Sequence, residues 1–228
     1  MAQVNDSAAR DDGADRGREH AEKVAAFGRE LFLGYDLQRA IDRFDLESDG
    51  RFAYVDYLSD RCRVDRGTAR VDVQGEGGEW TEIADPFSAL VVYDMLCHFQ
   101  DQDGDPRLSG DFCSSGSLTM MAGFFATKEL RNYDALAGHA DDLAAGCESI
   151  GGIVLPTTAH ADLTCAIPVF KWFDAIFQFW DGDDEFAPKA TFLWDRNSLL
   201  FIHMETFSYL TRDIFRKIYP DYEEYPSS

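Results

Sequence analysis

Apolar residues near the start of the chain recur with the period of a helix. Positions with this spacing are Val24, Phe27, Leu31, Leu37, Ile41 and Phe44. Gly34 separates the two runs, and Asp36 stands where a helix-capping side chain is favoured. The pattern therefore predicts two short helices.

Between residues 51 and 73 apolar and polar residues alternate, which is the pattern of half-buried strands. Ala53, Val55 and Tyr57 share one face of the first strand. In the next two strands the apolar residues that alternate with charged ones are Cys62 and Val64, then Ala69, Val71 and Val73. Turn-forming pairs stand at Ser59–Asp60 and Arg66–Gly67. We predict three short strands joined by two-residue turns, an antiparallel meander.

Two further helices follow the meander. Asp85–Pro86 is a typical helix start, and residues 87–99 are apolar nearly all round, which predicts a central, buried helix. A second helix is predicted after Asp134, where Gly151–Gly152 ends a stripe of apolar residues. That stripe consists of Leu136, Ala140, Leu143, Cys147 and Ile150.

The last third of the chain returns to strands. Ala175–Trp180 and Ala190–Trp194 flank an acidic turn at 181–188, and a final helix with Thr206 as its expected cap follows. The apolar stripe of that helix is Phe207, Leu210, Ile214 and Ile218. Because strands cluster instead of alternating with helices, we predict a single α+β domain in which an antiparallel sheet with a β-meander packs against helices. We expect it to span residues 16–220, between a disordered tail at 1–15 and a polar tail at 221–228.

The composition of the chain limits which kinds of partner it can bind and indicates its cellular compartment. The chain has 21 basic and 42 acidic residues, a formal charge of −21, so a nucleic acid or an anionic membrane would be repelled. The longest apolar stretch, Ala166–Trp180, is broken by Lys171 and Asp174 and is too short to span a membrane. No pair of the five cysteines has CxxC spacing, and residues 1–20 contain no apolar core of a signal peptide. We expect reduced, mostly buried thiols in a cytoplasmic protein.

Three segments resemble an uncharacterised family of anaerobic bacteria and archaea, domain of unknown function 3786. The most specific is FQFWDGDDEFAPKATFLWD (Phe177–Asp195), in which Ala187 stands where the family has a proline. The others are YDMLCHF (Tyr93–Phe99) with the downstream LSGDF, and CESIGG (Cys147–Gly152). The resemblance covers residues 35–219. It implies no activity, cofactor or site residue, because we know of none established for the family.

The acidic turn is the first candidate site. Asp181, Asp183, Asp184 and Glu185 place four carboxylates within five residues, and hard cations take carboxylate oxygens as ligands. The alternative is a solvated hairpin turn whose Asp side chains bond to their own backbone.

His203 and Glu205 are the second candidate pair. On a strand they would share a face and could bind one metal ion together with Asp183 and Glu185, whereas on a helix they would lie about 200° apart. His203 could instead be a satisfied core histidine. The metal hypothesis requires the acidic turn and the residues before the final helix to meet in space.

The third candidate lies on the central helix. Asp94, His98 and Asp101 are spaced i, i+4, i+7, so they share one side of a helix. Two carboxylates beside an imidazole would raise its pKa, which suits acid–base catalysis or metal binding. An ordinary surface ion pair is the alternative.

Aromatic residues in the late strands could line a pocket for a flat cofactor or could form one wall of the core. They are Trp172, Phe173, Phe177, Phe179, Trp180 and Trp194. We take Trp180, Asp181, Asp195, Asp94 and His98 as ligand-binding candidates, in a pocket bounded by the late strands and the central helix.

Two functional classes follow. The first, based on the absence of catalytic motifs and the aromatic density, is a non-enzymatic ligand-binding or accessory protein of anaerobic metabolism. The alternative is a metal-dependent enzyme that uses the carboxylate and histidine residues. The sequence specifies neither a cofactor nor a partner.

Overall fold

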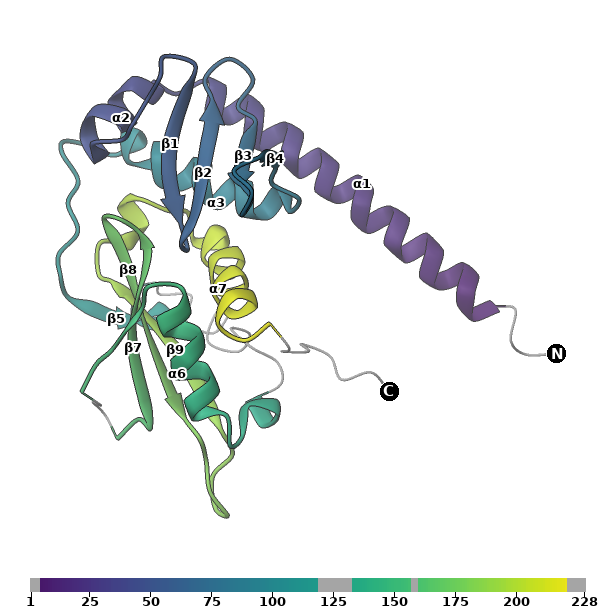
Figure 1. Ribbon diagram of the computed structural model, residues 1–228, viewed down its shortest axis with the longest axis vertical. Coiled ribbons are helices and arrows are strands. Elements are labelled where there is room, and N and C mark those ends of the chain that lie inside the picture. Colours follow the sequence, from purple (N-terminus) through teal and green to yellow (C-terminus); the bar gives the residue numbers. More distant parts are fainter. Residues whose placement is uncertain (1–4, 119–132, 157–159, 221–228) are drawn as a thin grey trace.

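The computed structural model describes residues 5–118, 133–156 and 160–220. Its first half is a helical pair, a four-stranded sheet and a central helix (Figure 1). The helices are α1 (Asn5–Leu33), α2 (Leu37–Phe44) and α3 (Pro86–Cys97), which continues as the 3-10 helix η1 (His98–Asp101). The strands are β1 (Phe52–Tyr57), β2 (Asp60–Asp65), β3 (Val71–Gln74) and β4 (Trp80–Glu82), in the order β1-β2-β3-β4.

The second half is a five-stranded sheet in the order β5-β9-β8-β7-β6, with all neighbours antiparallel. Its strands are β5 (Phe112–Ser114), β6 (Ile153–Val154), β7 (Leu163–Phe170), β8 (Phe173–Trp180) and β9 (Lys189–Asp195). Its helices are α4 (Ser115–Leu118), η2 (Tyr133–Leu136), α6 (Ala140–Ser149), η3 (Ser198–Leu200) and α7 (Met204–Ile218). The prediction of an α+β fold with an antiparallel meander is confirmed, although the strands form two sheets.

Local capping signals set where the helices start. Asp36 accepts the Gln38 backbone N–H at 2.9 Å, and Asp85 accepts the Phe87 N–H at 2.9 Å with Pro86 directly inside the helix. Both caps agree with the prediction. The central helix α3 is buried on most sides, as its uniformly apolar sequence requires.

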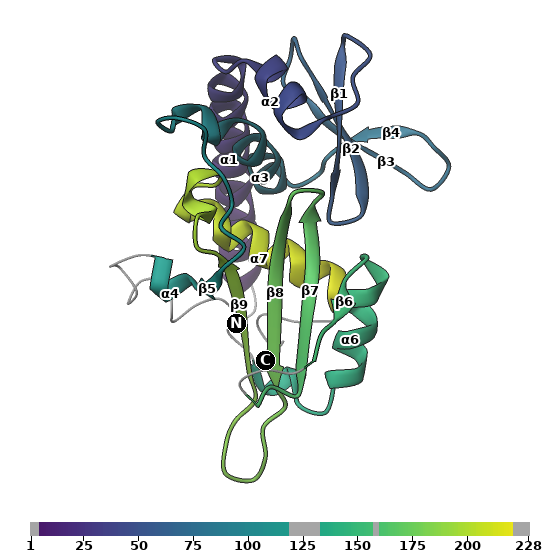
Figure 2. The same cartoon turned by 90° about the vertical axis from the view of Figure 1, so that its left-hand side faces the viewer.

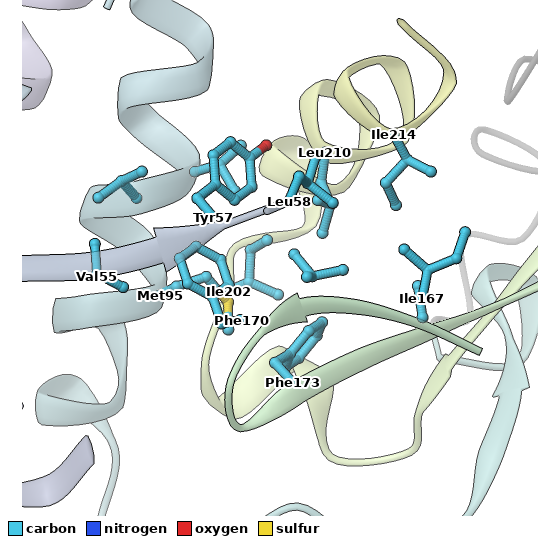
Figure 3. Close-up of a cluster of buried hydrophobic side chains, with 14 of the residues drawn as sticks. Val55, Tyr57, Leu58, Met95, Ile167, Phe170, Phe173, Ile202, Leu210 and Ile214 are labelled. Atoms are coloured by element: carbon cyan, nitrogen blue, oxygen red, sulfur yellow. The ribbon is translucent and has the colours of Figure 1, made fainter. Parts of the chain in front are cut away.

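One continuous cluster of buried side chains joins the two sheets through α3 and α7. Figure 3 shows its centre, where the β1–β2 turn reaches the β7–β8 end of the second sheet beside α7. The Leu58 backbone N–H donates to the Val169 carbonyl at 3.0 Å, and the buried Tyr57 hydroxyl donates to Asp213 of α7 at 2.8 Å. The junction between the halves is therefore both apolar and hydrogen-bonded.

Four sequence predictions need correction. The helix α1 begins at Asn5, although residues 1–15 were expected to be disordered; Ala and Arg there favour helix. The β1–β2 turn is Leu58–Ser59, both with positive φ, because β2 already begins at Asp60. The β2–β3 connection spans 66–70 and is longer than two residues.

The fourth correction concerns the helix expected after Asp134. The left-handed Gly138 (φ +78°) separates a short 3-10 turn from α6, so the main helix begins only at Ala140. The predicted polar tail at 221–228 lies outside the described residues.

Candidate functional site

Side chains from three separate segments meet where α3 ends and α7 begins. Asp94 comes from α3, His98 and Asp101 from η1, and His203 stands directly before α7. We call this group the histidine junction; it comprises Asp94, His98, Asp101 and His203, with Tyr35, Gln102 and Thr206 as bonded neighbours. The predicted alignment of Asp94 and His98 on one side of the helix places both residues here.

Asp94 fixes the start of α7 from a different helix. One carboxylate oxygen accepts the His203 ring Nδ1 at 2.7 Å. The other accepts the His203 backbone N–H at 2.9 Å and the Thr206 hydroxyl at 2.6 Å. A carboxylate at a helix N-terminus also stabilises the helix dipole. The expected cap, Thr206, is therefore wrong: the N-cap is His203, and Thr206 lies in the first turn.

Hydrogen bonding favours the charged form of His203. The bond from its ring to Asp94 raises the pKa of His203, partly opposed by burial, and the charges of Asp94, Glu205 and Asp101 act in the same direction as the bond. The side chain is 45% exposed. Because Nδ1 is held by Asp94, Nε2 is the nitrogen that can meet a ligand or exchange protons with solvent.

His98 has the opposite electrostatics. Its ring lies against that of His203, with centroids 3.8 Å apart, and its side chain is only 12% exposed. Burial and then the charge of His203 lower the pKa of His98 and outweigh Asp94 and Asp101. The prediction that two nearby carboxylates would raise this pKa is therefore wrong.

The polar contacts of His98 are incomplete. Nε2 lies 3.2 Å from the Leu199 carbonyl and 3.3 Å from Gln102 Nε2. Nδ1 is buried and has no hydrogen-bond partner in the described part of the chain. The carboxylate of Asp101, which accepts a hydrogen bond from the Tyr35 hydroxyl, lies 3.8 Å away. A protonated His98 could donate to Leu199 and approach Asp101, so proton uptake would change contacts here.

The junction thus pairs a histidine that favours its charged form with one that favours its neutral form. Two contacting groups whose environments push their pKa values apart are suited to hold and pass a proton. Cys97, the neighbouring thiol, is buried, and this burial raises its pKa, so it remains protonated.

The acidic turn at 181–188 lies far from the histidine junction. The β8–β9 ladder runs from Trp180 opposite Lys189 to Ala175 opposite Trp194, and β9 alone spans roughly 20 Å. Figure 2 shows the hairpin tip and the start of α7 at opposite ends of this ladder. The expectation that the acidic turn and the residues before α7 meet in space is wrong.

A shared metal site therefore has no geometric support. Asp183 and Glu185 are in the tip, whereas His203 is the N-cap of α7 and Glu205 lies exposed in its first turn. Within residues 5–118, 133–156 and 160–220, no three or more His, Cys, Asp or Glu side chains are grouped so that they could hold a metal ion.

The tip has the structure of a self-bonded turn. Asp183 Oδ1 accepts the backbone N–H groups of Glu185 and Phe186, both at 2.8 Å, and Gly182 has a φ of +81°. Asp181 accepts the Gly138 N–H at 2.5 Å. The two Asp183 bonds match the solvated-turn alternative, whereas the Asp181 bond ties the base of the tip to the segment before α6.

Asp195 and Trp180, two of the predicted ligand-binding residues, make structural contacts at the ends of strands β9 and β8. Asp195 is 3% exposed and accepts four hydrogen bonds, from the backbone and hydroxyl of Ser109 and from the backbone N–H groups of Gly110 and Asn197. It ties the 102–111 loop to the end of β9. Trp180 stacks under the Lys189 ammonium at the base of the hairpin, 5.1 Å from the ring centroid.

A pocket of about 420 Å³ lies near the junction and was not predicted. It is lined by Arg43, Phe44, Asp105, Arg107, Leu108, Trp172 and Phe201. Phe44 and Trp172 stack with centroids 3.9 Å apart and planes at 9°. We call it the aromatic pocket. Of the predicted aromatic set only Trp172 lines it; Phe173, Phe177, Phe179 and Trp194 are buried core residues.

Arg43 is the polar centre of the aromatic pocket. Its guanidinium donates to Asp105 at 2.5 Å and to the Pro106 carbonyl, and it lies 4.7 Å from the Phe99 centroid. Two buried donors of the lining residues, Arg43 Nε and Trp172 Nε1, have no hydrogen-bond partner among the residues that the structure describes. Arg43 was not predicted from the sequence, because the lining residues come from separate segments and share no motif.

Comparison with known proteins identifies one family. No curated protein and no solved structure matches the chain. The part of the chain that the structure describes contains no helix with the length and apolarity needed to cross a membrane. Residues 36–217 match the model of the family described as domain of unknown function (DUF3786), which covers most of the chain, and the protein therefore belongs to that family.

Proposed function

We propose that the protein binds a small, flat anion in the aromatic pocket and acts as a non-enzymatic binding or accessory protein. The pocket volume of about 420 Å³ is in the range of small-molecule sites. The parallel rings of Phe44 and Trp172 form an apolar wall against which a planar molecule can pack.

Charge favours an anion. Arg43 and Arg107 share one carboxylate, Asp105, so these three lining residues carry a net charge of 2 − 1 = +1. This local positive charge stands against a formal charge of −21 for the whole molecule. It would attract a carboxylate or phosphate group of a ligand.

The observation that carries the proposal is the pair of unpartnered donors. Buried N–H groups are nearly always bonded, and leaving one unsatisfied costs about 1–3 kcal/mol. Arg43 Nε and Trp172 Nε1 both belong to lining residues. An acceptor on a bound molecule would supply the missing bond after a small rotation of the side chain.

Binding can be tested with benzoate and 2-naphthoate as flat anions and benzyl alcohol as a neutral control. We expect saturable quenching of tryptophan fluorescence by the anions, and a loss of affinity of about tenfold or more in Arg43→Gln. Trp172→Phe should reduce the quenching, whereas the matched variant Trp180→Phe at the hairpin base should retain it. Equal effects of both tryptophan variants, or equal binding of benzyl alcohol, would contradict the proposal.

The histidine junction supports a second candidate, acid–base catalysis without a metal. The supporting observation is the contact between two histidines with oppositely shifted pKa values, one of them backed by Asp94. Substrate turnover would then be lost in His203→Gln while anion binding in the aromatic pocket persists. We also propose that the protein is cytoplasmic and acts in anaerobic metabolism. Its free cysteines, four of which are buried, and its resemblance to a family of anaerobes support this proposal.

A further inference from the structure

Four arginines line one pocket beside the first sheet. Figure 1 shows this sheet at the other end of the molecule from the tip of the β8–β9 hairpin. The arginines come from α1 (Arg29), from the approach to β1 (Arg51), from β2 (Arg63) and from the approach to β3 (Arg70). Together they line a pocket of about 480 Å³ that we call the arginine basin. Its other lining residues are Phe52, Asp65, Thr68, Asp72 and Glu82.

A single buried carboxylate positions two of these arginines. Asp72 is 3% exposed at its side chain and stands directly opposite Arg63 in the β2–β3 register. Its two oxygens accept Arg63 Nε at 2.9 Å and Arg70 Nε at 2.5 Å. Asp72 thus bonds two guanidinium groups, one of which, Arg70, also lies 3.9 Å from a Glu82 oxygen. An added anion would lower the mutual repulsion of the two guanidinium groups.

Aromatic rings fix the plane of Arg63. Its guanidinium carbon lies 4.1 Å from the Phe52 centroid and 4.5 Å from the Trp80 centroid. Cation–π contacts on both sides, together with the bond to Asp72, leave this side chain little freedom. A preoriented guanidinium loses less entropy when it binds an oxyanion.

The guanidinium N–H groups of the basin that are not bonded to a carboxylate are suited to bind an oxyanion. Arg51, Arg63 and Arg70 each bond their carboxylate partner through Nε, and their terminal nitrogens make no hydrogen bond to any residue that the structure describes. Arg51 is paired with Asp65 at 2.9 Å. The four arginines and the three acids of the basin, Asp65, Asp72 and Glu82, leave a charge of 4 − 3 = +1.

We propose that the arginine basin binds an oxyanion group, a phosphate or a carboxylate, of a small molecule through the terminal N–H groups of Arg51, Arg63 and Arg70. Paired N–H donors of guanidinium match the two oxygens of such a group. Nucleic acid is a poor candidate because the rest of the molecule repels it. The basin shares no lining residue with the aromatic pocket. Oxyanion binding in the basin can therefore be tested independently of anion binding in the aromatic pocket.

Titration calorimetry of the full chain, at constant ionic strength set with chloride, tests the proposal with inorganic phosphate and with citrate. We expect saturable binding of at least one, and tighter binding of phosphate or of citrate identifies the ligand group. The double variant Arg51→Gln, Arg70→Gln should weaken binding about tenfold or more. Both side chains are substantially exposed, 73% and 47%, so this variant is expected to fold.

Arg70→Gln alone and Arg196→Gln each remove one positive charge, so Arg196→Gln, at an exposed arginine outside the basin, is the matched control for that single variant. Its affinity should equal that of the wild type. Three results would overturn the proposal: no saturable binding to the wild type, equal weakening by Arg196→Gln, or an unchanged affinity in the double variant. An Arg70→Lys variant with wild-type affinity would also overturn recognition by paired guanidinium donors, since lysine keeps only the charge.

Discussion

The hairpin tip and the histidine junction both concentrate carboxylates, but their carboxylates bond to different parts of the chain. In the tip, Asp183 bonds backbone groups two and three residues ahead. At the junction, Asp94 bonds His203 and Thr206, more than a hundred residues away. The density of carboxylates in the sequence marks the first region, whereas the second brings together side chains from α3, from η1 and from the start of α7.

This difference has an energetic consequence. A local turn re-forms its bonds easily and stays close to solvent, so losing one acceptor costs little. A carboxylate that joins distant elements is hard to replace because water cannot reach all the groups it leaves behind. We therefore expect the loss of stability on removing a carboxylate to be larger when that carboxylate is more buried and when its hydrogen-bond partners are more distant in the sequence.

The largest effect is expected at Asp195, which is 3% exposed and accepts four bonds. Asp195→Ala should lower the free energy of unfolding by about 3 kcal/mol, because it leaves hydrogen-bond donors of the 102–111 loop without an acceptor. Urea denaturation measures this loss. Asp195→Asn, which keeps one acceptor oxygen, should lose less, and a change below about 1 kcal/mol in the alanine variant would show that the loop is held by other contacts.

Removing Asp94 should have the next largest effect. Asp94→Ala takes away the acceptor of three bonds at the start of α7, and we expect a loss of about 2 kcal/mol in urea denaturation. The control is Asp141→Ala in the exposed first turn of α6, which should change stability by no more than about 0.5 kcal/mol. Similar losses in both variants would remove the distinction between the junction and an ordinary helix start.

The two histidines should give opposite and smaller pH effects. The folded pKa of His203 lies above the ordinary histidine value of about 6.5. Its stabilisation is therefore complete below pH 6.5 and is lost as the pH rises through the folded pKa. His98 has a folded pKa below 6.5, so its contribution is present above pH 6.5 and is lost as the pH falls.

The variants His98→Gln and His203→Gln separate these contributions when each is compared with the double variant. His98→Gln retains only the His203 contribution and should lose stability as the pH rises above 6.5. His203→Gln should lose stability as the pH falls below 6.5. Parallel pH profiles of the two single variants would contradict the opposite shifts.

The smallest effect is expected in the tip. Asp183→Ala removes two bonds to exposed backbone groups, which water can replace, so the loss should be about 0.5 kcal/mol or less. Binding of benzoate should be unchanged in the same variant. A loss as large as that of Asp94→Ala would mean that the tip is not merely a solvated turn.

Local signals in the sequence predict much of the fold. Alternation over residues 51–73 predicts β1, β2 and β3, and the Asp85–Pro86 pair predicts the start of α3. The strand β7 has buried residues on both faces, so it shows no alternation, and β4 is too short for a pattern. These elements are defined by their partners in the sheets.

The candidate site was predictable only in part. Spacing along a helix places Asp94 and His98 together, but the meeting with His203 depends on how α3 packs against α7. The lowered pKa of His98 likewise comes from burial and from His203, neither of which the local sequence contains. Phe44, Trp172 and Phe201 come from three segments, so the aromatic pocket has no motif.

The indole N–H signals of the four tryptophans provide the most direct test of the claim that binding chemistry lies near the junction and not at the acidic tip. In a benzoate titration followed by NMR, we expect the Trp172 signal to shift saturably while that of Trp180, at the base of the tip, stays in place. A shift of Trp180 without a shift of Trp172 would contradict the account.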